Sequence, residues 1–100
     1  MTFANVGTLG TLPGKRDEVV AHLTRPSNAL AEAGCLLYEV GVDDSQPDMV
    51  FVMELWVSTE AHRASLQLPE VQQAIAEARP WLSGEFGGFR FDVVGSPLRN

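Results

Sequence analysis

Two histidines, His22 and His62, carry the side chains best suited to acid–base or metal chemistry in this sequence. They are expected on different helices, and neither lies at ligand spacing from another histidine, so the sequence predicts no metal site. We interpret both as solvated helix surface. His62 is the better functional candidate, because it follows the strongest strand pattern in the chain closely.

Motifs for common cofactors and nucleophiles are absent from the sequence. It has no glycine-rich phosphate loop, no cysteine cluster and no serine elbow of the kind that hydrolases use. The single cysteine, Cys35, cannot form an intrachain disulfide, and we interpret it as a small buried hydrophobe. We therefore expect no bound cofactor.

The length and the charge of the chain limit its class and its partners. One hundred residues suit a single domain, which we place at residues 1–100. The net charge is −6, and Lys and Arg are scattered singly, so nucleic acid is not an expected partner. The first residues lack a secretion signal, and no apolar run approaches membrane-spanning length. We expect a cytoplasmic protein with no membrane partner.

Turn residues divide the first half of the chain into a strand, a helix and a second strand. Residues 3–12 are rich in Val, Thr and Leu and end at a Pro-Gly turn, which predicts the first strand. Acidic residues then favour the start of a helix over residues 17–34, and Pro26 predicts a kink or a break into two parts. Residues 35–40 form the second expected strand, followed by a polar loop over 42–48.

The second half of the chain repeats the order strand, helix, strand. Residues 49–57 have the strongest strand pattern, and a serine N-cap begins a short helix over residues 58–66. Another helix begins near Pro69 and ends or kinks near Pro80, and residues 86–94 alternate as the last strand after a glycine pair that permits a bulge. The order is that of a ferredoxin-like α+β fold, βαββαβ.

The strand over residues 49–57 is largely apolar on both faces. One face carries Phe51, Met53, Leu55 and Val57, and the other carries Val50, Val52, Glu54 and Trp56. Such a strand must be central and covered twice, and so few helices supply only one cover. The sequence therefore predicts a homodimer in which a second copy covers the other face.

Three segments carry a resemblance to a known family. They read LPGKRDEV after the first strand, AEAGCLLYEV at the second, and FVMELWVSTEAHRASLQLPEV across the third strand and the following helix. Through them the sequence resembles the antibiotic biosynthesis monooxygenase superfamily, which includes small quinol monooxygenases and haem-degrading relatives. The resemblance implies a dimeric α+β barrel, in which the sheets of two subunits pack together.

The resemblance also implies an oxidation without flavin or metal, because a deprotonated phenol or quinol can itself reduce dioxygen. The protein then supplies position and desolvation. In such relatives an Asn on the first strand and a Trp at the end of the third strand lie near the substrate, and Asn5 and Trp56 match those positions. Their structural alternatives are a polar residue at a strand edge and a packing residue in the core or interface.

Four further residues are candidates for the substrate pocket. Ser65 stands where many relatives have a histidine, and His62 lies one helical turn earlier, so the two share a helix face. Glu54 points the same way as Trp56 and needs a raised pKa to act as a general base near neutral pH. Tyr38 and Trp81 are pocket candidates with stronger structural alternatives.

Three functions remain open at the level of sequence. The first is cofactor-independent oxidation of a small phenol or quinol with dioxygen, with Asn5, Trp56 and His62 as the catalytic candidates. The second is non-oxidative binding or isomerisation of a small aromatic or carbonyl metabolite. The third is haem binding or degradation, which Ser65 disfavours because a hydroxyl offers no imidazole ligand.

Overall fold

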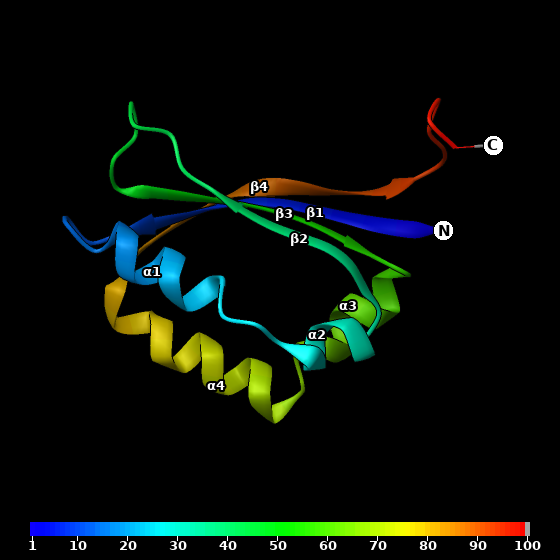
Figure 1. Cartoon of the computed structure of the whole chain (residues 1–100), viewed down its shortest axis with the longest axis horizontal. Helices are drawn as coiled ribbons and strands as arrows, with labels where there is room; N and C mark the ends of the chain where they lie inside the picture. The colour runs from blue at the N-terminus through cyan, green and yellow to red at the C-terminus, as the bar shows by residue number, and fades with distance from the viewer. Residues whose placement is uncertain (100) are drawn as a thin grey trace.

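A four-stranded antiparallel sheet with all of its helices on one face forms the architecture of the chain (Figure 1). The computed structural model describes residues 1–99. The strands are β1 (Thr2–Thr11), β2 (Cys35–Gly41), β3 (Met49–Trp56) and β4 (Leu82–Val93). The helices are α1 (Arg16–Leu23), α2 (Asn28–Glu32), α3 (Thr59–Ser65), α4 (Pro69–Ala78) and the 3-10 turn η1 (Arg79–Trp81). The strand order β2-β3-β1-β4 is that of the predicted ferredoxin-like α+β fold.

Local sequence signals set the ends of the helices as expected. The helical region after β1 is broken into α1 and α2 around Pro26, which disfavours the helical conformation of the residue before it. Ser58 caps α3, and its side-chain oxygen accepts a hydrogen bond from the backbone nitrogen of Ala61 at 3.0 Å. Pro69 opens α4, and Pro80 lies in the turn η1 that ends the helical segment.

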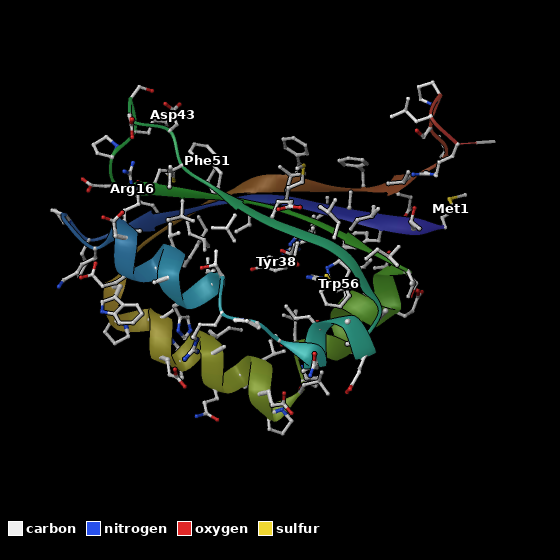
Figure 2. The ribbon with its side chains drawn as sticks, viewed as in Figure 1. Met1, Arg16, Tyr38, Asp43, Phe51 and Trp56 are labelled. Atoms are coloured by element: carbon white, nitrogen blue, oxygen red, sulfur yellow. The ribbon has the colours of Figure 1, made fainter. Side chains whose placement is uncertain are left out.

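The two central strands, β1 and β3, carry the core on their helix-covered face. Val50 and Trp56 are almost completely buried there, and Val52 lies between them in the alternating pattern of β3. Figure 2 shows Trp56 and Tyr38 pointing toward the helices, whereas Phe51 points to the opposite side of the sheet. The strand pattern predicted from the sequence is thus confirmed for β3.

Two expectations about individual elements were wrong. The last strand begins at Leu82, because Leu82 continues the ladder by pairing with Thr11, and the register shift falls between Leu9 and Thr11 instead of at the glycine pair. Neither histidine is solvated, since the side chain of His22 is only 5% exposed and His62 is 8% exposed. The Nε2 atom of His22 lies 2.7 Å from the carbonyl oxygen of Ala74, so the packing of α4 on α1 buries it. The ring of His62 packs against Phe3 and Trp56.

The remaining sequence expectations have different outcomes. Cys35 is half-buried instead of fully buried, and its thiol donates to the Leu37 carbonyl oxygen at 3.4 Å. In the part of the chain from residue 1 to residue 99, no helix is both long enough and apolar enough to cross a membrane. The single domain and the cytoplasmic location stay predictions.

Candidate functional site

A buried carboxylate, that of Glu54, lies at the centre of the helix-covered face. Glu54 is 8% exposed, and its Oε2 accepts a hydrogen bond from Nδ2 of Asn5 at 2.8 Å. Its Oε1 accepts a hydrogen bond from Nε1 of Trp56 at 3.0 Å. Burying a carboxylate is costly unless donors replace its water, so these two bonds hold the charged group in the sheet.

The carboxylate belongs to a polar row that crosses all four strands. Tyr38 of β2 pairs with Glu54 of β3, Glu54 pairs with Asn5 of β1, and Asn5 pairs with Arg90 of β4. Nε of Arg90 donates to Oδ1 of Asn5 at 3.2 Å. A single amide side chain therefore links a buried carboxylate with a guanidinium at the β4 edge, and the negative and positive groups of the row lie on opposite sides of Asn5.

His62 of α3 lies beside this carboxylate. Its Nε2 is 4.0 Å from Oε1 of Glu54, and its ring packs edge-on against Trp56 with centroids 5.3 Å apart. The ring of Phe3, on β1, also lies beside the imidazole, with ring centroids 5.4 Å apart. Loss of hydration lowers the pKa of His62, the charge of Glu54 opposes this change, and the charge of Arg90 adds to it. The imidazole is therefore neutral near pH 7 and can exchange protons.

Two other candidates, Ser65 of α3 and Tyr38 of β2, lie next to this cluster. Ser65 is buried, and its hydroxyl donates to the backbone carbonyl of His62 at 2.6 Å, so this hydroxyl is used within α3. Burial, followed by the negative charge of Glu54, raises the pKa of Tyr38. The phenol of Tyr38 consequently stays protonated beside the carboxylate and can donate a hydrogen bond.

Trp81 lies away from the cluster. Its backbone carbonyl accepts a hydrogen bond from the backbone nitrogen of Leu12, just beyond the last residue of β1. Its indole packs edge-on against the ring of His22, with ring centroids 5.8 Å apart. Trp56, in contrast, pairs with Phe3 near the start of β1. The structure thus gathers six sequence candidates on one part of the sheet, and these are Asn5, Tyr38, Glu54, Trp56, His62 and Ser65.

Arg90 and Phe3 are the members of the cluster that the sequence candidates did not include. Arg90 falls within the predicted last strand, and its place beside Asn5 depends on the register between β1 and β4. The residue pattern of a single strand does not determine how that strand pairs with another. Phe3 has the ordinary pattern of a core strand residue, so no sequence signal connected it with His62.

A cavity of about 410 Å³ opens beside the polar row. It is lined by Asn5, Val6, Phe86, Gly87, Gly88, Phe89 and Arg90. Its size falls within the range of small-molecule sites. Asn5 both lines this cavity and binds the Glu54 carboxylate, so it connects the space for a ligand with the buried base.

The side chains of this site suit proton transfer. A carboxylate, a neutral imidazole and a protonated phenol lie next to one another, with amide and indole donors that can stabilise negative charge. Within residues 1–99, no three His, Cys, Asp or Glu side chains are grouped as metal ligands.

Comparisons with known proteins give one family. Residues 2–77 match the family model described as antibiotic biosynthesis monooxygenase. The chain is 36% identical to a candidate antibiotic biosynthesis monooxygenase from Chloroflexus aurantiacus J-10-fl, with a TM-score of 0.82 and 96% of each chain covered. It is 26% identical to a candidate of the same description from Deinococcus radiodurans, with a TM-score of 0.77, covering 96% of this chain and 95% of that one. A search of functionally curated proteins gives no match.

Proposed function

The chain belongs to the antibiotic biosynthesis monooxygenase family, and from this premise we propose that it oxidises a small phenol or quinol with dioxygen without a bound cofactor. The observation that carries this proposal is the buried Glu54 carboxylate, linked through Asn5 to a cavity of about 410 Å³. A reaction that starts with deprotonation of a hydroxyl needs such a base beside such a space.

Glu54 is the proposed general base. A substrate hydroxyl that replaces Asn5 as the hydrogen-bond partner of Oε2 would meet the carboxylate directly, while the indole of Trp56 continues to hold Oε1. The displaced amide of Asn5 can then stabilise the phenolate oxygen or the reduced oxygen species. His62, which is neutral and 4.0 Å from Oε1, can receive or return the proton.

The proposed oxidation balances with dioxygen as the oxidant. The phenolate transfers one electron to dioxygen, and the resulting radical pair combines at a ring carbon to form a C–O bond and a hydroperoxide. Loss of water breaks the O–O bond and the C–H bond at that carbon and leaves a carbonyl. For a naphthol, the products are a naphthoquinone and one water molecule. The protein's contribution is to position and desolvate the reactants.

A homodimer is part of this proposal. The sheet face opposite the helices exposes large apolar side chains, which are Leu37, Met53, Phe89 and Phe91. Contiguous exposed apolar surface of this kind marks an interface. A second copy that packs its own open face on this one would form the α+β barrel.

Oxygen uptake tests the proposed function. We expect fresh, metal-free protein without added flavin to consume dioxygen with at least one of a panel of naphthols, hydroquinones and anthrones. Loss of one preorganised donor can cost about 10²- to 10³-fold, so Asn5→Ala should reduce turnover sharply, whereas Asn28→Ala on α2 is the matched control. No uptake across the panel, or equal turnover in wild type and Asn5→Ala, would overturn the assignment.

The second candidate function is proton transfer without oxidation. The pairing of Glu54 with a neutral His62 favours it, because a carboxylate and an imidazole can move a proton between two positions of a carbonyl compound without dioxygen. Exchange of deuterium from solvent into a cyclic ketone under anaerobic conditions, lost in Glu54→Gln, would support this function in place of oxidation.

A further inference from the structure

The cavity at the β4 edge has a wall of bare backbone at Gly87 and Gly88. A Cβ atom on Gly88 would overlap the carbonyl oxygen of Val6, and Gly88 has φ of +123°, which side chains rarely adopt. A Cβ atom on Gly87 would lie 2.8 Å from the hydroxyl of Thr8. Glycine is used in a strand where another backbone or a ligand approaches closely. Phe86 and Phe89 line the same cavity, and each is 64% exposed.

A positive charge lies at the polar end of this cavity. Arg90 uses its Nε to bind Asn5, and within residues 1–99 its guanidinium forms no ion pair. Its Nη1 and Nη2 atoms thus remain available, in a chain whose net charge is −6. Arginine presents these atoms as a planar fork that binds a carboxylate through two parallel hydrogen bonds.

The geometry points to a ligand class, and we propose that this cavity binds a planar hydroxyaryl carboxylate. The ring of Phe86 and the glycine backbone would contact the ligand ring, and the Arg90 fork would hold the carboxylate. The hydroxyl would then point along the polar row toward Asn5 and Glu54. This inference rests on the proposed function, because it names the substrate class of the same site.

The polar row explains why an anion is compatible with a carboxylate nearby. Asn5 lies between the two charges, with Nδ2 on Glu54 and Oδ1 on Arg90, so the ligand's carboxylate and the protein's carboxylate are at opposite ends of one amide. A ligand with a hydroxyl beside its carboxylate can match both ends. A neutral phenol can use only the end at Glu54.

Binding of two matched ligands tests this inference apart from turnover. We expect wild-type protein to bind 1-hydroxy-2-naphthoate at least about 10-fold more tightly than 1-naphthol in calorimetric titrations, since hydrogen bonds between charged groups are stronger than those between neutral groups. Arg90→Gln should remove this preference, so that the two ligands bind with similar affinities. Arg90→Lys, which keeps the charge without the fork, should retain part of the preference.

Controls separate the inference from folding and from the proposed function. Arg63→Gln removes a charge from exposed α3 surface and should keep the preference, and circular dichroism should be unchanged in every variant. A preference for the carboxylate without oxygen uptake would support the ligand class and overturn the oxidation. Equal affinities in wild type, a preference that survives Arg90→Gln, or loss of both ligands in folded Arg90→Gln would overturn the ligand class, even where naphthol is oxidised.

Discussion

The two faces of the sheet are made by alternate residues of the same strands, yet they differ in almost every property. On the helix-covered face, Val50 and Trp56 are 0% and 1% exposed, and the Glu54 carboxylate is buried with them. On the open face, Met53 is 50% exposed and pairs with Val6 of β1 and Glu39 of β2. Helices from this chain complete the first face only. Substitutions at adjacent positions of β3 should therefore test two separate properties, chemistry and assembly.

The largest effect should come from Glu54→Gln on the covered face. Glutamine keeps the shape of the side chain but cannot remove a proton, and loss of general base catalysis costs about 10²- to 10⁴-fold in rate. We expect turnover of the best naphthol to fall by this amount in oxygen-electrode assays. The mass of the assembly in solution, measured by light scattering, should not change, because the open face is intact. Wild-type turnover in this variant would remove Glu54 from the mechanism.

The next effect should come from the adjacent residue, through Met53→Glu on the open face. In a dimer this side chain would be buried beside Glu39, the β2 residue that pairs with Met53, and burying an unpaired charge costs several kcal/mol, which weakens association by about 10²-fold or more. We expect light scattering at micromolar concentration to give about twice 10.9 kDa for wild type and the monomer mass for this variant.

The control for assembly is Leu98→Glu, which adds the same charge at a residue that is 93% exposed and lies outside the sheet. It should leave the dimer mass unchanged. A monomeric wild type at the same concentration would contradict the proposed dimer and would leave the open face to another partner.

The sequence predicted these two faces well, because alternation along a strand is a local property. Ser58 and Pro26 likewise mark helix ends through their own side chains and immediate neighbours. The polar row was predicted only in part, since the contact of Arg90 with Asn5 joins residues 85 positions apart and depends on register. His22 was assigned to the surface for the same reason, because the helix that buries it comes from a distant part of the chain.

A smaller effect should separate the two tryptophans. Trp56→Phe keeps an aromatic ring but removes the indole donor to Oε1 of Glu54, and an unpaired buried acceptor costs about 1–3 kcal/mol. Each factor of ten in rate corresponds to about 1.4 kcal/mol, so we expect roughly 10-fold slower oxygen uptake. Trp81→Phe is the matched control and should keep wild-type turnover, because Trp81 packs on His22 outside the cluster. Equal losses in both variants would indicate general destabilisation.

The smallest effect should appear in the pH dependence of stability, through the burial of His62 on the covered face. Its pKa in the folded protein is lowered below the ordinary value of 6.5, mainly because burial removes water from the charged form. Below pH 6.5, and down to the folded pKa, the unfolded chain therefore binds more protons at this residue than the folded chain does. The free energy of unfolding should fall as the pH falls through this window. His62→Gln removes this contribution, so urea unfolding between about pH 7.5 and about pH 5 should show a shallower decline than in wild type. Arg63→Gln, one position along α3, does not titrate in this range and should keep the wild-type decline. An unchanged or steeper decline in His62→Gln would mean that the covered face does not disfavour the imidazolium, and His62 would then be charged when it contacts Glu54.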